Sequence, residues 1–170
     1  MKTVDATFEV VKEKFTIIYE AVNCFEASHN LDNWKFTDDH QGGVTIKNPN
    51  CQRNDFKYAI PLNYSLKQLS SDYAKQGREN PSKEAYISLQ EELERDLEAS
   101  EYNLAAKVVD ANGNTVLESF YLGYAFDWCY RDGDDLEDRL KEEVSNSDAE
   151  TEVLERLESL KDSVMNIFKN

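Results

Sequence analysis

Residues 80–100, NPSKEAYISLQEELERDLEAS, decide the fold because they predict one long amphipathic helix. Asn80 can cap this helix, and Pro81 suits its first position because proline lacks the N–H that would be unpaired there. Apolar residues recur at spacings of three and four, which places them on one buried face. These residues are Tyr86, Leu89, Leu93 and Leu97. The rest of the chain must supply a core against that face.

A second set of residues in and just after this stretch is acidic. It consists of Glu91, Glu94, Glu98 and Glu101. At about 100° per residue, these side chains form a stripe that is separate from the apolar face. We expect the stripe to face solvent and regard it as a candidate partner-binding surface.

The overall composition is that of an acidic protein with enough apolar residues for a core. The chain has 170 residues, of which 40% are hydrophobic and 11% aromatic, and we expect one domain over residues 1–170. The net charge of −15 is concentrated, because residues 81–101 hold 2 bases and 7 acids and residues 127–170 hold 6 bases and 14 acids. Such concentration destabilises a compact state through self-repulsion, so either the charge has a role or the fold tolerates it.

Three widely spaced cysteines, Cys24, Cys51 and Cys129, fit a reducing compartment better than a disulfide framework. The first residues lack the apolar core of a signal peptide, and no stretch approaches the ~20 apolar residues of a membrane span. We therefore expect a cytoplasmic protein that has no contact with a membrane.

The first 27 residues carry conflicting patterns. An apolar series steps by four and three, which predicts a helix over residues 5–27. Several β-branched residues in the same stretch, such as Val10 and Ile17, favour a strand instead. The helical series is the longer pattern, so we expect the helix. The series consists of Val4, Phe8, Val11, Phe15, Ile18, Val22 and Phe25.

The pattern then alternates with a period of two. Three short runs beginning at Trp34, Val44 and Phe56 predict antiparallel strands, separated by segments rich in turn residues. Ser65 can cap a short helix that Gly77 closes, directly before the long helix. The sequence DANGN at residues 110–114 predicts the turn of a hairpin between two further strands.

Two helices are expected to complete the chain, over residues 134–144 and 148–168. In the last one, Val153, Leu157, Leu160, Val164 and Ile167 again step by four and three. The predicted fold is an α+β domain with a small antiparallel sheet of about five strands packed against amphipathic helices. Long helices lie at both chain ends, and they would pack together or across a homodimer.

The usual catalytic and metal motifs are absent from the sequence. Cys24, His29, His40 and Cys51 lack the closely spaced ligand pairs of a zinc site. Gly42 and Gly43 fall in an expected hairpin turn rather than in a phosphate-binding loop. The segment from Asp110 has neither the glycine nor the final glutamate of a calcium loop. We therefore expect no enzyme activity, no metal and no cofactor.

A second acidic group lies before and within the first turn of the helix predicted at residues 134–144. It comprises Asp132, Asp134, Asp135, Glu137 and Asp138. One or two of these residues can cap the helix, because carboxylates accept its unpaired N–H groups and match its dipole. We regard the group as a second candidate partner-binding patch.

The charge excludes direct binding of nucleic acid, since the surface repels phosphates. Four carboxylates over about 15 Å of helix have a charge density similar to that of one DNA strand, which presents about four phosphates over the same length at one per ~3.4 Å. In composition and size, the chain is similar to the DNA-mimic inhibitors that phages and mobile elements use against restriction or CRISPR nucleases. This resemblance implies an anti-restriction or anti-CRISPR inhibitor whose partner is a nucleic-acid-binding protein with a basic groove. The alternative is an acidic interaction or scaffold protein that binds its partner through an apolar helix face.

Overall fold

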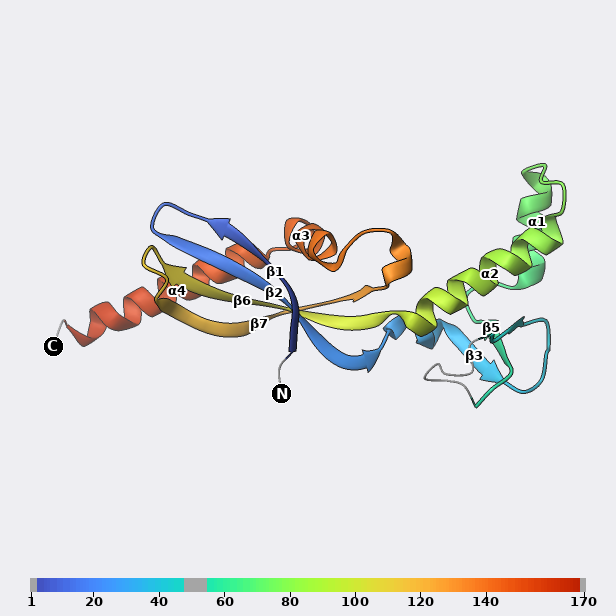
Figure 1. Cartoon of the computed structure of the whole chain (residues 1–170), viewed down its shortest axis with the longest axis horizontal. Coiled ribbons are helices and arrows are strands. Elements are labelled where there is room, and N and C mark those ends of the chain that lie inside the picture. Colours follow the sequence, from blue (N-terminus) through green and yellow to red (C-terminus); the bar gives the residue numbers. More distant parts are fainter. Residues whose placement is uncertain (1–2, 48–54, 169–170) are drawn as a thin grey trace. The chain divides into compact units, whose positions relative to one another are not determined.

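The computed structural model describes residues 3–47 and 55–168, and it divides the chain into two compact units (Figure 1). Unit 1 comprises Met1–Phe25 and Glu101–Asn170, and unit 2 comprises Glu26–Ser100. Two compact units can still unfold as one cooperative domain, so the single domain over residues 1–170 stays a prediction. Cys51 and most of the turn expected before the third short strand lie outside the described residues.

The described chain is a mixture of helices and antiparallel strands. Its elements in chain order are β1 (Thr3–Val11), β2 (Phe15–Ala27), the 3-10 helix η1 (His29–Asn33), β3 (Trp34–Thr37), β4 (Val44–Thr45), β5 (Tyr58–Pro61), α1 (Leu66–Lys75), α2 (Pro81–Glu98), β6 (Ser100–Asp110), β7 (Thr115–Trp128), the 3-10 helix η2 (Tyr130–Asp132), α3 (Leu136–Asn146) and α4 (Ala149–Ile167). The α+β class is confirmed. The described residues form strands in two sheets, of four and three strands, rather than in one sheet of about five.

The predicted N-terminal helix is wrong, because residues 5–27 form most of the antiparallel hairpin β1–β2. Phe8 pairs with Tyr19 across the hairpin, and their rings stack at a centroid distance of 5.1 Å. In β2, Ile17, Tyr19 and Ala21 are fully buried on one face. Both faces of β2 carry apolar residues, so a strand produced the spacings of four and three by coincidence. Of the two long helices predicted at the chain ends, the described chain therefore contains only the C-terminal one, α4.

The sheet of unit 1 has the strand order β1-β2-β6-β7. Strands β2 and β6 are neighbours in this sheet, although residues 28–99 separate them in sequence, so unit 2 is an excursion of the chain between two paired strands. The hairpin of β6 and β7 is confirmed. In its turn, Asp110 Oδ1 accepts the N–H groups of Asn112 and Asn114, both at 2.8 Å, and Gly113 has a φ of 82°.

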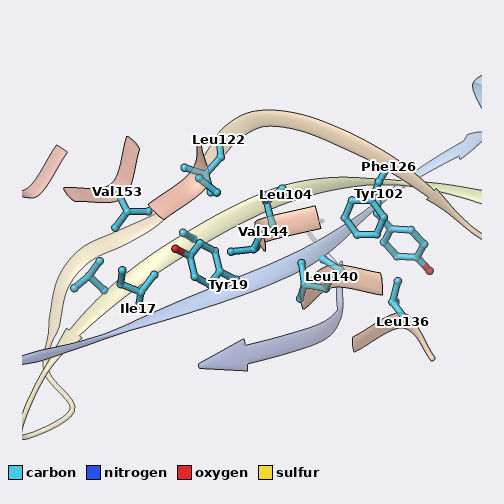
Figure 2. Close-up of a cluster of buried hydrophobic side chains, with 14 residues drawn as sticks. Ile17, Tyr19, Tyr102, Leu104, Leu122, Phe126, Leu136, Leu140, Val144 and Val153 are labelled. Carbon is cyan, nitrogen blue, oxygen red and sulfur yellow. The ribbon is translucent and has the colours of Figure 1, made fainter. Parts of the chain in front are cut away.

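Helices α3 and α4 pack on one face of this sheet, and both were predicted. Figure 2 shows Leu136, Leu140 and Val144 of α3 beside the aromatic and aliphatic side chains of the strands. Val153 of α4 is fully buried in the same cluster, and Leu157 packs against it. Burial of these apolar side chains is the main force that holds the helices on the sheet.

A buried carboxylate joins three strands of unit 1. Glu20 of β2 is 4% exposed, forms an ion pair of 3.3 Å with Lys107 of β6 and accepts a hydrogen bond from Ser119 of β7. These partners compensate for the cost of removing the carboxylate from water.

Within the described residues, no helix is long and apolar enough to cross a lipid bilayer.

Unit 2 contains the sheet β3-β5-β4 and the helical hairpin of α1 and α2. The three short strands are antiparallel, as predicted. Ser65 caps α1 in a capping box with Gln68, which confirms the expected start of that helix. On α2, the predicted apolar face is confirmed, since Leu89 and Leu93 are fully buried against Trp34 and other core residues.

Candidate functional site

A cavity of about 500 Å³ lies in unit 1 between strand β1 and the start of helix α3. Its lining residues are Val4, Asp5, Ala6, Thr7, Asp135, Leu136 and Glu137. Three of them carry carboxylates, and none is basic. A cavity with this lining can receive a positively charged group, because each carboxylate attracts a cation and offers two acceptor oxygens.

Asp5 faces this region because of a β-bulge. In the pairing of β1 with β2, Val4 lies opposite Val22 and Ala6 lies opposite Ala21, so Asp5 is the extra residue. A bulge changes the direction of the side chain that it carries. Asp5 Oδ2 accepts hydrogen bonds from Asn23 Nδ2 at 2.9 Å and from Tyr102 Oη at 3.2 Å. These two bonds fix the carboxylate beside the cavity.

The Tyr102 phenol stays protonated at neutral pH and can therefore donate to Asp5. Burial of the side chain, together with the negative charge of Asp5 and their hydrogen bond, raises the pKa of Tyr102 to about 12. Tyr102 is only 4% exposed and stacks on Phe126 at a centroid distance of 5.8 Å. Asp5 is thus supported by a rigid aromatic pair of the core.

The start of α3 holds the second acidic patch of the sequence in place. Asp135 caps the helix, because its Oδ1 accepts the N–H of Asp138 at 2.8 Å, which confirms the expected capping role. Asp132 Oδ2 accepts the N–H of Cys129 at 3.2 Å. Both carboxylates therefore have local structural roles.

The next two acids of α3 share one base. Lys141 Nζ lies 2.7 Å from Glu137 Oε1 and 3.3 Å from Asp138 Oδ1. These hydrogen bonds raise the pKa of the Lys141 ammonium above its ordinary value. Exposed pairs of this kind contribute little to stability and rearrange easily, so Glu137 and Asp138 can exchange Lys141 for a basic group of a partner.

All five acids of this patch are exposed, and the fold brings Asp5 to them. The name α3 acid surface is used below for this set: Asp5, Asp132, Asp134, Asp135, Glu137 and Asp138. Asp5 was not predicted as a site residue, because the apolar spacing of the first 27 residues placed it at the start of a helix. The alternation of residue types over Thr3–Val11, which is typical of a strand, was the signal that could have indicated a different position for Asp5. No short-range pattern, however, predicts which residue of a strand a bulge will turn.

The first acidic stripe is not the continuous solvent-facing row that was expected. Glu91 is exposed, Glu98 is half-buried, and the Glu94 side chain is 14% exposed in an ion pair of 3.1 Å with Lys47. Glu101 is wrongly placed by the sequence, since α2 ends at Glu98 and Glu101 lies on β6, where it is only 7% exposed. An inner strand of a sheet leaves little room for solvent at this position. Three carboxylates of the predicted stripe remain on α2, over about 10 Å of helix.

Other candidate chemistry receives little support from the geometry. Among residues 3–47 and 55–168, no group of three or more His, Cys, Asp or Glu side chains could hold a metal ion. His40 packs edge-on against the Tyr58 ring at 5.1 Å, and His29 belongs to η1.

Unit 2 contains a second cavity, of about 540 Å³. Its lining residues are Gln41, Gly42, Ile60, Pro61, Ser65, Leu66, Lys67, Ser70 and Ser82. Among these described lining residues, Lys67 is the single charged side chain, so no acid–base pair converges on the cavity. The α3 acid surface is therefore the candidate site.

No family model, curated protein or solved structure matches this chain. The function must accordingly be argued from the α3 acid surface and from the distribution of charge.

Proposed function

We propose that the protein is an acidic protein-binding inhibitor, a DNA mimic that blocks the nucleic-acid-binding groove of a host defence nuclease. The observation that carries the proposal is the α3 acid surface, where three exposed carboxylates line a cavity of about 500 Å³ that has no basic lining residue. A partner that presents lysine or arginine would pair with these carboxylates. Such a partner acts in the cytoplasm, as a restriction or CRISPR nuclease of a cell that a phage or mobile element enters.

The charge distribution supports this assignment. Unit 1 contains 21 acidic and 10 basic residues, whereas unit 2 contains 13 and 9. Most of the net charge of −15 therefore lies in the unit that holds the α3 acid surface. A field of one sign accelerates association with a partner of the opposite sign, and salt weakens this effect. A groove that binds phosphates is a partner of that sign.

The cavity adds a specific element to the general attraction. A Lys or Arg side chain that enters it would meet Asp5, Asp135 and Glu137, which come from two elements of the fold. Asp5 and Asp135 are already fixed by hydrogen bonds, so little side-chain entropy would be lost on binding. The carboxylates of Glu91, Glu94 and Glu98 on α2 form a further acidic patch within this proposal.

The alternative is an acidic interaction or scaffold protein that binds through an apolar helix face. One observation favours it: α4 exposes several large apolar side chains within the described chain. They are Leu154, Leu160, Val164, Met165, Ile167 and Phe168, named the α4 apolar face below. An apolar contact would resist high salt, whereas a contact made by the α3 acid surface would not.

The test is capture of partners on the immobilised protein from lysates of cells that carry restriction or CRISPR nucleases, followed by elution in a salt gradient. The proposal predicts that a basic nuclease elutes as the salt concentration rises and that double-stranded DNA or guide RNA displaces it. The captured nuclease should also lose DNA cleavage when the protein is added in excess. A partner that stays bound at high salt and is not displaced by nucleic acid would instead support the alternative of binding through an apolar helix face.

A further inference from the structure

The apolar face of α4 that packs on the core of unit 1 continues along the helix past the end of that core. Val153 is fully buried, and Leu157 packs against the core of unit 1. Further along the same face, at steps of three and four residues, the exposed fraction rises to 37% at Leu160, 43% at Val164 and 70% at Ile167. Figure 1 shows that the C-terminal half of α4 extends past the end of the strands of unit 1. Half of this apolar face therefore has no cover within unit 1.

The uncovered face is large enough for a specific interface. Leu154, Met165 and Phe168 flank the apolar series and are 41%, 50% and 80% exposed. At about 200 Å² for each large side chain, the α4 apolar face exposes on the order of 600 Å². Monomers rarely expose a larger apolar patch, and two such faces together reach the ~1,200 Å² of the smallest stable interfaces.

The charges on α4 show which occupant suits this face. At about 100° per residue, Glu155 and Asp162 lie on the opposite side of the helix, and Glu158 lies at the edge of the apolar face beside Met165. The charged residues nearest the apolar face are Arg156 and Lys161. The carboxylate nearest the contact, Glu158, is already paired with Lys161 at 2.8 Å, so a basic helix gains little there and is a poor occupant. An identical helix buries the same apolar side chains on both sides and needs no opposite charge there.

We propose that the α4 apolar face binds a second copy of this chain, with the two α4 helices antiparallel about a two-fold axis. This arrangement packs Leu160 against Val164 of the second copy, and Leu157 against its Ile167, in both directions. Each Lys161 lies near the axis, but its ion pair of 2.8 Å with Glu158 offsets the repulsion between them.

A parallel pair is disfavoured for two reasons. It would place the helix positions of Arg156 and Lys161 of the second copy side by side twice, at a spacing of five residues, where a second cation would meet Arg156, whose guanidinium already stacks on the Phe120 ring at 4.1 Å. It would also bring the two copies of unit 1, which both carry high negative charge, to the same end of the helix pair, where they repel. The antiparallel dimer keeps the two copies of unit 1 apart and leaves the α3 acid surface free in each copy. The dimer is thus independent of the proposed inhibition.

The test is sedimentation equilibrium of the full chain over a dilution series. The proposal predicts twice the chain mass of 19.6 kDa, with a Kd on the order of micromolar. The double variant Leu160→Glu/Val164→Glu should weaken dimerisation at least tenfold while the circular dichroism and Tm of the monomer stay unchanged. The control Ser159→Glu/Asn166→Glu adds the same charge on the opposite side of α4 and should remain dimeric.

A spin label at Thr151 then distinguishes the two orientations, with labelled wild type as the control for the native cysteines. At 1.5 Å per residue, the antiparallel dimer offsets the two labels by about 33 Å along the helix axis, whereas a parallel dimer gives no axial offset and therefore the shorter distance between labels. A chain that stays monomeric at about 100 times the expected Kd would overturn the proposal. A dimer that survives Leu160→Glu/Val164→Glu, or labels at the short distance, would overturn it as well.

Discussion

The Tyr102 phenol donates a hydrogen bond of 3.2 Å to Oδ2 of Asp5 and thereby connects the core of unit 1 to the α3 acid surface. Tyr102 lies on the inner strand β6, and Asp5 lies in the bulge of the edge strand β1. The bond crosses β2, whose Asn23 donates to the same carboxylate oxygen. One carboxylate of the candidate site is therefore positioned by two strands of the sheet.

This relationship predicts the effect of Asp5→Asn on the ionisation of Tyr102. The variant removes the negative charge beside the phenol, so the pKa of Tyr102 should fall from about 12 toward its ordinary value of 10.0. Burial is the largest cause of the shift and remains, so the pKa should stay above that value. The measurement is an NMR titration of ring-labelled tyrosine, assigned with Tyr102→Phe. Glu118→Gln on β7 is the control, and an unchanged pKa in Asp5→Asn would contradict the contact.

A second prediction concerns stability at alkaline pH. Burial raises the pKa of both Tyr19 and Tyr102 to about 12, and burial with the Glu92 hydrogen bond raises that of Tyr64 further. Between about pH 10 and 12 the unfolded chain loses phenolic protons that the folded chain keeps. The free energy of unfolding should therefore fall as the pH rises through this window, by linkage. Urea denaturation at a series of pH values measures it, and Tyr19→Phe or Tyr102→Phe should lessen the fall. A stability that is constant from pH 9 to 12 would refute the assignment.

In unit 2, Trp34→Phe should destabilise the fold by about 1–3 kcal/mol, because it leaves a buried acceptor without its donor. The indole Nε1 of Trp34 donates at 2.8 Å to Oδ2 of Asp96, which is only 5% exposed. The matched control is Trp128→Phe, where the indole bond to the Asp134 carbonyl is exposed and longer, at 3.3 Å. Chemical denaturation followed by circular dichroism gives both values. Equal losses of unfolding free energy in the two variants would show that the buried hydrogen bond contributes no more to stability than the exposed one.

Packing of α3 on the sheet predicts the cost of Leu140→Ala. Leu140 is fully buried, so the truncation should cost about 2–5 kcal/mol through lost burial and a cavity. Leu62→Ala, at a side chain that is 59% exposed, should stay within about 0.5 kcal/mol of wild type. Thermal denaturation measures both variants. A small effect of Leu140→Ala would mean that α3 does not pack on the sheet as described.

The sequence predicted those parts of the fold that short-range chemistry determines. The Ser65 cap, the apolar face of α2 and the turn at residues 110–114 each follow from local residues, and the structure contains them. The first 27 residues were assigned wrongly because a strand with two apolar faces, such as β2, can imitate helical spacing. Pairing with β6, a distant part of the chain, decides between the two conformations there.

The candidate site was predictable only in part for the same reason. Asp132–Asp138 are close in sequence, so a charge count finds them. Asp5 reaches them through the pairing of β1 with β2 and through a bulge, neither of which a local pattern encodes. Glu101 was misplaced because the helical stripe was extended past the end of α2 into β6.

The central claim is that the α3 acid surface binds a basic groove, and neutralisation at constant size tests it most directly. The triple variant Asp134→Asn/Glu137→Gln/Asp138→Asn removes three exposed charges there and keeps the Asp135 cap. The control Glu155→Gln/Glu158→Gln/Asp162→Asn removes three exposed charges from the far side of α4. The α3 variant removes both exposed ion pairs of Lys141, and the α4 control removes the exposed ion pair of Lys161 with Glu158.

The decisive measurement is the Kd of each variant for the captured nuclease at low and at high salt. The account predicts that the α3 variant binds at least about tenfold more weakly than wild type at low salt, which is a loss of about 1.4 kcal/mol in binding free energy. The affinity of this variant should also depend less on salt concentration. The α4 control should lose less than about threefold, because only the long-range field changes. Equal losses in the two variants, or none in the α3 variant, would contradict the account.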